Sequence, residues 1–243
     1  MTRQAGNAPY WIDPAARVVD FPDVALALSE PNGLLAIGGD LSRERLLLAY
    51  SRGIFPWFEP EQPILWWAPD PRLVLQPARL KLSRSLKKTL RRGEFTLTMD
   101  NCFSEVIKAC SGRRPKQAGT WISADMQAAY CDLHTAGYAH SVECWFDGEL
   151  AGGLYGVSIG RIFFGESMFT RVTDASKVAF VALVRQLERW HFPLIDCQVY
   201  TSHLESLGAS LMPRKHFCEV LQRECSPLIG APGWRLDADI DLI

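Results

Sequence analysis

The chain has 243 residues, of which 48% are hydrophobic and 22% charged, proportions typical of a soluble globular protein with a substantial core. No run of about eighteen apolar residues occurs and the first seven residues are polar, so the sequence predicts neither a membrane-spanning helix nor a signal peptide. The seven cysteines include no CxxC pair, which favours reduced thiols in a cytoplasmic protein over a disulfide framework or a zinc site.

The formal net charge of −1 conceals an uneven distribution along the chain. Residues 1–120 hold 17 basic and 12 acidic side chains, whereas residues 121–243 hold 9 and 15. Within the positive part, residues 71–93 carry eight basic side chains and no acidic one, and residues 113–116 add three more basic side chains. This balance argues against a general nucleic-acid-coating protein and favours one local phosphate-binding surface.

The N-terminal part, residues 1–70, is predicted to form a small domain, and residues 71–243 the main domain. Turn-forming residues are dense between residues 21 and 58, and a short helix is expected around residues 46–50. Large aromatic side chains follow, as expected of a core or of a pocket wall: Trp57, Phe58, Trp66 and Trp67.

A basic helix is predicted near the start of the main domain, over residues 83–92. Leu82, Leu86 and Leu90 recur every four residues and form a narrow apolar stripe, and Gly93 is placed to end the helix. The other faces hold the basic side chains Arg84, Lys87, Lys88, Arg91 and Arg92. Because these charges have one sign and cannot pair with one another, this surface is expected to bind phosphates rather than only face solvent.

The remaining pattern predicts a mixed sheet. The expected elements, in order, are helices over 103–110 and 124–135, two hairpins over 141–169, a helix over 174–190, a strand over 192–199, a short helix over 203–207, a strand over 210–212 and a helix over 213–224. The strand after the long helix should lie parallel to an earlier strand, because a helix connects them. This order is that of an α+β, GNAT-like (acyl-CoA N-acyltransferase-like) core, which by itself fixes no function.

Polar side chains interrupt two of these strands. Glu166 lies in the last strand of the hairpins, and Asp196 and Gln198 lie in the strand after the long helix. A buried carboxylate needs a partner, so the two strands indicate a polar site in the centre of the sheet. Asp196 and Gln198 are two residues apart and are expected to share one face of their strand.

Three other motifs do not indicate a site. Residues 156–160 match GxSxG, but Ser158 lies in a strand that ends in a hairpin turn, unlike the nucleophile elbow of a serine hydrolase. Cys197 alternates away from its polar neighbours and is interpreted as a core residue. Residues 169–176 contain no glycine, so the pyrophosphate loop of a CoA-dependent transferase is missing.

Nine blocks of the chain resemble the leucyl/phenylalanyl-tRNA–protein transferase family: residues 30–36 (EPNGLLA), 38–42 (GGDLS), 53–58 (GIFPWF), 64–67 (ILWW), 119–122 (GTWI), 152–156 (GGLYG), 165–169 (GESMF), 196–198 (DCQ) and 206–209 (SLGA). The resemblance implies transfer of Leu or Phe, less readily Met, from aminoacyl-tRNA to proteins that begin with Arg or Lys, which marks them for degradation. It also implies a GNAT-like C-terminal domain, action in the cytoplasm, and neither a metal nor a soluble cofactor. We expect a monomer that needs no membrane.

The same resemblance implies roles for individual residues. Gln198 and Asp196 would be the catalytic pair, with the Gln198 amide oxygen accepting an N–H of the attacking amine while Asp196 either polarises that contact or takes the proton. Glu166 would hold the cationic acceptor side chain, and the basic helix would contact the tRNA acceptor stem. The residues implied to line the aminoacyl pocket are Trp57, Trp121, Leu154, Leu183, Leu187 and Ile195.

Other functions remain open on the sequence alone. A peptidoglycan-type aminoacyl transferase shares the donor, but the chain lacks paired GNAT-like domains and a coiled-coil arm. A CoA-dependent N-acyltransferase is disfavoured by the glycine-free loop. A non-catalytic RNA-binding domain would use the basic helix and leave Glu166, Asp196 and Gln198 unexplained. For the two carboxylates the structural alternative is an ordinary buried ion pair.

Overall fold

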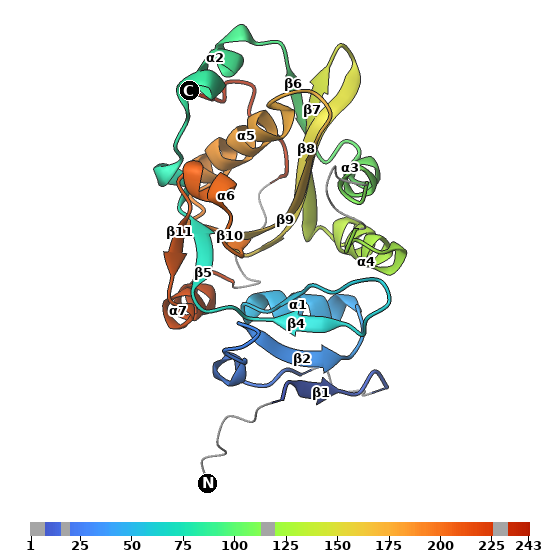
Figure 1. Ribbon diagram of the computed structural model, residues 1–243. Helices are drawn as coiled ribbons and strands as arrows, with labels where there is room; N and C mark the ends of the chain where they lie inside the picture. Colours follow the sequence, from blue (N-terminus) through green and yellow to red (C-terminus); the bar gives the residue numbers. More distant parts are fainter. Residues whose placement is uncertain (1–7, 16–19, 113–119, 226–232) are drawn as a thin grey trace.

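The strands of the protein form two sheets, which lie one above the other in Figure 1. The computed structural model describes residues 8–15, 20–112, 120–225 and 233–243, and the structural statements below refer to these residues. The smaller sheet has the order β1-β2-β4-β3, with the strands β1 (Tyr10–Ile12), β2 (Leu34–Gly38), β4 (Leu65–Trp67) and β3 (Phe55–Pro56). These strands are short and were not predicted, because turn residues dominate this part of the sequence.

The larger sheet has the order β11-β5-β10-β9-β8-β7-β6. Its strands are β5 (Arg72–Leu75), β6 (Thr96–Met99), β7 (Ala139–Phe146), β8 (Glu149–Ile159), β9 (Ile162–Thr170), β10 (Leu194–Gln198) and β11 (Ser210–Met212). The two predicted hairpins are confirmed as β7, β8 and β9, which pair antiparallel in that order. The predicted mixed sheet is also confirmed, because β10 is parallel to β9 and antiparallel to β5. Neither β5 nor β6 was predicted.

Helices cover both faces of the larger sheet (Figure 1). One face carries α5 (Ala175–Arg189) with α2 (Arg84–Arg92) beside it, and the other carries α3 (Phe103–Cys110) and α4 (Ala124–Thr135). The short α6 (Ser202–Ser206) and the longer α7 (Arg214–Glu224) flank β10 and β11, and single 3-10 turns occur at Val24–Leu26 and Pro77–Arg79. Each helix predicted in the main domain is present within one or two residues of its expected bounds. No helix in the described ranges has both the length and the apolar character needed to cross a membrane.

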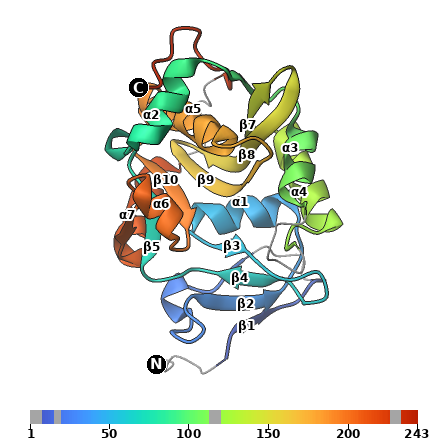
Figure 2. The ribbon, with the colours of Figure 1, turned by 45° about the horizontal axis from the view of Figure 1, so that its top comes forward.

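The helix α1 (Arg43–Ser51) lies between the two sheets (Figure 2). Its buried side chains Leu46 and Tyr50 belong to one hydrophobic core with Tyr155 of β8, Phe164 of β9 and Phe217 of α7. The smaller sheet ends at Trp67 and the larger begins at Arg72, but this shared core spans both. The domain boundary at residue 70 therefore stays a prediction, and the arrangement brings side chains of the N-terminal part to the centre of the larger sheet.

Candidate functional site

Two irregular strand segments place the polar side chains of the site. In the pairing of β8 with β9, Gly156 faces Gly165 and Tyr155 faces Ser167, so Glu166 is the extra residue of a bulge. Gly156 permits this close approach, because a Cβ there would lie 2.3 Å from the Phe164 carbonyl oxygen. Bulges are common beside active sites, where they redirect a side chain out of the regular alternation.

The neighbouring strand β10 is irregular at the same level. Asp196 faces Val74 and Gln198 faces Leu73, so Cys197 is skipped, and Gln198 has a φ of 62°. The pairing is therefore irregular between Asp196 and Gln198, but both side chains still point to one core cluster, as predicted. Asp196 contacts Arg72 over the Phe55 and Phe217 rings of that cluster, whereas Cys197 lies in the other cluster. The Gln198 side chain reaches Glu166, where Nε2 donates to Oε1 over 2.8 Å.

Glu166 is the centre of a hydrogen-bond network that joins four elements. Besides Gln198, it accepts hydrogen bonds from the hydroxyls of Tyr50 on α1, at 2.8 Å, and Tyr130 on α4, at 3.0 Å. The two hydroxyls also lie within hydrogen-bonding distance of each other, but because each has a single hydrogen, neither can donate to the other while both donate to Glu166. Glu166 forms no ion pair within the described residues, so the structural alternative of a buried ion pair does not apply to it.

Burial sets the ionisation of this network. The pKa of Glu166 is raised to about 7, chiefly by burial and also by the nearby Asp196 carboxylate, against the lowering effect of its three hydrogen-bond donors. The pKa values of Tyr50 and Tyr130 are raised well above the ordinary tyrosine value, chiefly by burial and next by the Glu166 charge. Both tyrosines therefore stay protonated as donors at neutral pH.

Asp196 forms a buried ion pair with Arg72 of β5. Arg72 donates from Nε over 2.8 Å and from Nη2 over 2.7 Å, and the two side chains are 1% and 0% exposed. The guanidinium also lies over the rings of Phe55 and Phe217, at 4.6 and 5.0 Å from their centroids. Asp196 Oδ1 accepts the backbone N–H of Gln198 at 2.9 Å, so the pair holds the irregular turn of β10 in place.

The six side chains implied to line the aminoacyl pocket lie in three settings. Leu154, Leu183, Leu187 and Ile195 belong to one buried cluster on the α5 side of the sheet, each at most 3% exposed. Trp121 is half-buried against the other core cluster. Trp57 is 45% exposed and lines a separate hollow of about 340 Å³. This hollow is also lined by Val199 and Tyr200, the two residues that follow Gln198 in the chain. The structure brings four of the six together, and their role as a pocket stays a prediction.

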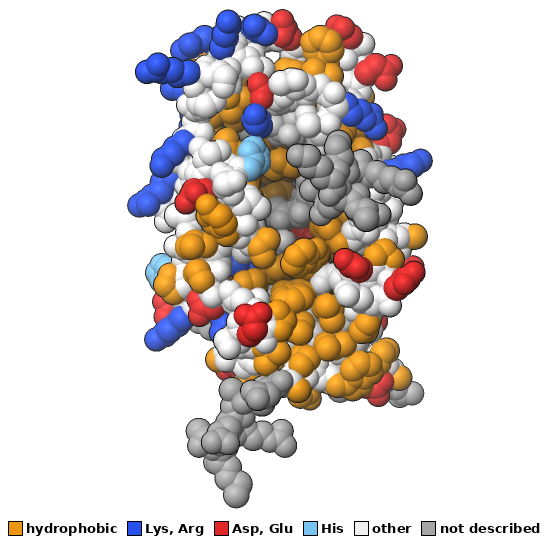
Figure 3. All heavy atoms as spheres, in the orientation of Figure 1, with side chains coloured by type: hydrophobic (Ala, Val, Ile, Leu, Met, Phe, Trp, Pro, Cys, Tyr) orange, Lys and Arg blue, Asp and Glu red, His pale blue; other side chains and the backbone are white. Residues whose placement is uncertain are grey.

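The predicted basic helix is present as α2. The Ser83 hydroxyl accepts the N–H of Leu86, and Gly93 ends the helix with a φ of 64°. The helix packs Leu86 into the core, while Arg84, Lys88, Arg91 and Arg92 are exposed and Lys87 is half-buried. Within the described residues, the single salt bridge of these five is the 4.0 Å contact of Arg92 with Glu94. Figure 3 shows the basic side chains gathered over α2, at the upper left. The second predicted cluster, residues 113–116, lies outside the described residues.

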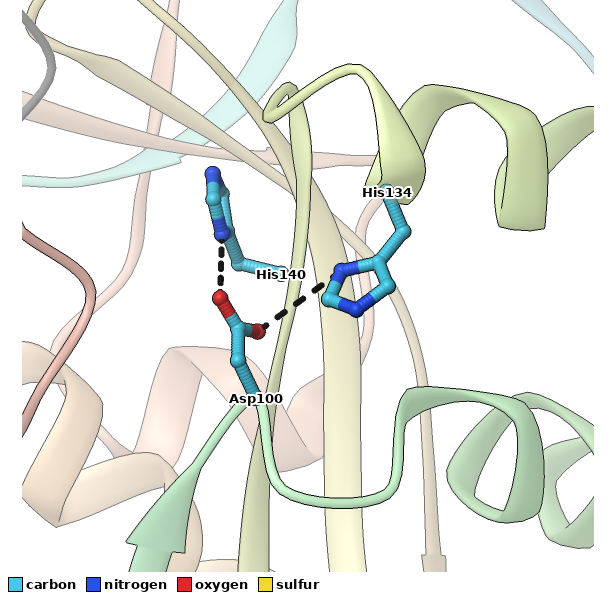
Figure 4. A group of neighbouring side chains, drawn as sticks. All are labelled: Asp100, His134 and His140. Atoms are coloured by element: carbon cyan, nitrogen blue, oxygen red, sulfur yellow. Dashed lines mark hydrogen bonds and ion pairs between the residues drawn. The ribbon is translucent and has the colours of Figure 1, made fainter.

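Asp100, His134 and His140 are a possible metal-ligand group, drawn in Figure 4. Their candidate ligand atoms lie within 4.8 Å of one another. His140 Nδ1 is 2.7 Å from Asp100 Oδ2, its Nε2 is 3.2 Å from the Gly137 carbonyl oxygen, and His134 Nδ1 is 2.7 Å from the Ala139 carbonyl oxygen. Because these atoms already bond to protein, we interpret the group as a structural link between the start of β7 and the loop after β6.

Sequence reasoning missed three residues of the network: Tyr50, Tyr130 and Arg72. Each tyrosine lies on a helix among buried apolar side chains, such as Leu46 on α1 and Leu133 on α4, so nothing in the local sequence separates it from a core residue. Arg72 was counted with the basic run, although three apolar residues, 73–75, follow it directly. The position of Arg72 next to this short apolar segment was the one feature of the sequence that indicated its burial.

Glu166 should make the free energy of unfolding depend on pH. Its pKa in the folded protein, about 7, lies above the ordinary value of 4.5, so the folded state binds more protons between these values. The free energy of unfolding should therefore fall as the pH rises through this window, by up to about 3 kcal/mol. Glu166→Gln should remove this fall. Urea unfolding of both proteins at several pH values checks this, and an equal pH dependence in both would contradict it.

Comparison with known proteins gives one family. The family model described as leucyl/phenylalanyl-tRNA protein transferase matches residues 74–222, and the model of that family's N-terminal domain matches residues 39–70. Among curated proteins named leucyl/phenylalanyl-tRNA–protein transferase, that of Thiobacillus denitrificans is 58% identical over 93% of this chain and 99% of its own length. That of Nitrosospira multiformis is 57% identical over 89% and 94%. Of the solved structures, L-PGS from Bacillus licheniformis aligns over 83% of this chain and 66% of its own, at 13% identity and a TM-score of 0.38, too slight a likeness to establish a fold.

Proposed function

The chain belongs to the leucyl/phenylalanyl-tRNA–protein transferase family, and we propose that it transfers Leu or Phe, and less readily Met, from aminoacyl-tRNA to the α-amino group of proteins that begin with Arg or Lys. The amine nitrogen attacks the carbonyl carbon of the aminoacyl ester and a peptide bond forms. The bond from that carbon to the ribose oxygen breaks, and this oxygen takes the proton that the amine loses. The ester is already activated, so positioning the two groups is the main task of the protein.

Gln198 is proposed to position the attacking amine. Its Nε2 donates to Glu166, which fixes the orientation of the amide, and no donor within the described residues contacts its Oε1. This free oxygen is the observation that supports the proposal most directly, because it can accept one N–H of the amine. A strong base is unnecessary, since an α-amino group with a pKa of about 8 is roughly one-tenth neutral at pH 7.

Asp196 is proposed to act through Gln198 rather than as the proton acceptor. Its carboxylate already receives two hydrogen bonds from Arg72 and one from the Gln198 backbone. The sequence left two roles open for Asp196: it polarises the contact of Gln198 with the amine, or it takes the proton. These hydrogen bonds favour the first role.

Glu166 is proposed to hold the cationic Arg or Lys of the acceptor. A carboxylate offers about four acceptor positions, and Tyr50, Tyr130 and Gln198 occupy three. One position remains for a charge-assisted hydrogen bond, and a cation beside Glu166 would lower its raised pKa.

The donor is proposed to occupy two surfaces. The aminoacyl side chain enters a pocket lined by Trp57, Trp121, Leu154, Leu183, Leu187 and Ile195. The tRNA lies on α2, through Arg84, Lys87, Lys88, Arg91 and Arg92. Contacts to phosphates carry no base information, so many tRNA sequences should be accepted and binding should weaken with salt.

Three wider proposals complete this function. We propose that the larger sheet with α5 is a GNAT-like domain, supported by its order of antiparallel strands, helix and parallel strand. We propose that the protein acts in the cytoplasm, where its aminoacyl-tRNA donor is made. We propose a monomer, because one chain supplies every residue named above.

Transfer of labelled leucine from Leu-tRNA to two peptides, one beginning with Arg and one with Met, tests the acceptor. We expect transfer to the Arg peptide alone. Transfer to neither peptide, with tRNA still bound, would contradict the proposal and favour the non-catalytic RNA-binding alternative.

A further inference from the structure

A cavity of about 900 Å³ lies beside the site and is not used by it. It is formed between α3, the C-terminal end of β9 and the first turn of α5. The residues from these elements that define its chemistry are Lys108, Met168, Arg171 and Ser176.

The first turn of α5 presents hydrogen-bond donors to this cavity. Ser176 lines the cavity and is only 9% exposed, yet its hydroxyl has no hydrogen-bond partner within the described residues. The N-cap residue, Asp174, makes no side-chain cap, because its carboxylate accepts from Thr89 at 3.1 Å and Lys177 at 2.8 Å. The Ala175 N–H donates to the Val172 carbonyl oxygen at 3.0 Å, and the N–H groups of Ser176 and Lys177 come next in the turn. Free N–H groups at the start of a helix need acceptors and attract anions, so an anion is the ligand that these two groups and the Ser176 hydroxyl can share.

The charges around the cavity favour an anion as well. Lys108 and Arg171 are exposed, and neither forms a salt bridge within the described residues. Arg171 is held in place, because its Nη1 donates to the Leu150 carbonyl oxygen at 3.0 Å and its guanidinium lies 5.4 Å from the Phe169 ring centroid. Glu105 is the single carboxylate among the lining residues, so the lining keeps a net positive charge.

The cavity lies between the basic helix and the site. The contact of Thr89 with Asp174 joins α2 to the start of α5. At the other end, Met168 lines the cavity and lies two residues from Glu166 on β9, which is about 7 Å along a strand. A chain of phosphates that leaves α2 beside Thr89 and ends at Gln198 can therefore pass this cavity.

We propose that the cavity binds a phosphodiester of the unpaired 3′ end of the donor tRNA, held by the Ser176 hydroxyl, the first N–H groups of α5, Arg171 and Lys108. The inference rests on the proposed function, since it concerns the same donor. It adds a phosphate contact between the acceptor stem on α2 and the ester at Gln198.

Two donors with the same ester separate the phosphate contact from other effects. Leu-tRNA carries the upstream phosphates, and 3′-O-leucyl-adenosine carries none. Ser176→Asp should raise the KM for Leu-tRNA about ten-fold or more, and Lys108→Ala should raise it about three-fold, while neither changes transfer from leucyl-adenosine more than about two-fold. An acidic residue in the first turn of a helix is favourable, and Lys108→Ala, at an exposed residue, tests the same contact if the buried Ser176→Asp does not fold. Thr173→Asp adds the same charge at an exposed residue outside the cavity lining and should behave as the unmodified protein.

A second experiment measures how strongly two competitors inhibit transfer from Leu-tRNA by the same variants. The trinucleotide CpCpA carries phosphates, and adenosine carries none. Ser176→Asp should weaken inhibition by the trinucleotide alone. Equal effects on both donors, equal effects on both competitors, or no effect at all would overturn the proposed phosphate site. If the unmodified protein does not transfer leucine from Leu-tRNA at all, the proposed function itself is refuted.

Discussion

Gln198→Ala should lower the rate of leucine transfer to an Arg-initiated peptide by about 100-fold or more, while the KM for Leu-tRNA changes less than about three-fold. The substitution removes the amide oxygen proposed to accept an N–H of the amine, an interaction that matters as the nitrogen begins to attack. Contacts of the tRNA with α2 are untouched, so donor binding should be kept. Single-turnover rates at saturating Leu-tRNA measure the change directly.

Two further variants show whether the lost group is the amide itself. Gln198→Met keeps the length of the side chain without its hydrogen bonds and should be as slow as Gln198→Ala. Gln222→Ala removes an exposed glutamine on α7 and should transfer at the unmodified rate. Near-normal transfer by Gln198→Met would mean that shape rather than hydrogen bonding is required, and Gln198 would then not be catalytic.

Glu166→Gln gives a contrast within the same network. It keeps the shape of the side chain and removes the charge proposed to hold the acceptor, so its effect should fall on the KM for the Arg peptide more than on the maximal rate. If Gln198 and Glu166 variants have the same kinetic signature, the two residues do not have the separate roles proposed here.

The sequence predicted those elements whose local pattern and termini agree. The helix α2 follows a leucine stripe from a Ser83 cap to Gly93, and both ends are where the pattern places them. Glu166 and Gln198 are 32 residues apart and were still expected together, because a helical crossover between strands favours parallel neighbours. The strand order alone was therefore enough to predict that the two strands with polar residues lie close together.

The hydrogen-bond partners of these residues could not be predicted from the sequence in the same way. Tyr50 and Tyr130 are 80 residues apart on different helices, and each reaches Glu166 only because α1 packs between the sheets and α4 covers one face. Local periodicity gives no information on such packing. Arg72 stands on a four-residue strand, too short for alternation to show that its charge is buried.

The Arg72–Asp196 pair gives the largest expected effect on stability. Arg72→Met should lower the free energy of unfolding by about 3–5 kcal/mol, because it leaves Asp196 buried without its counter-charge. Asp196→Leu should lower it by a similar amount, because it leaves the Arg72 guanidinium buried without its counter-charge. The double variant should recover most of the loss, since no unpaired charge remains and apolar side chains of similar size can fill the site. Urea unfolding of the three variants measures these differences.

An exposed ion pair supplies the matched control. Arg43 and Asp132 form an equally short pair, with Nη2 2.7 Å from Oδ1, but their side chains are 42% and 50% exposed. Removing either should change the free energy of unfolding by less than about 1 kcal/mol. A similar small loss in Arg72→Met would show that burial does not strengthen the Arg72–Asp196 pair. The recovered double variant should nevertheless transfer leucine poorly, because Asp196 no longer accepts the Gln198 N–H. Stability and activity would then separate in one protein, as expected if the pair both stabilises the sheet and positions Gln198.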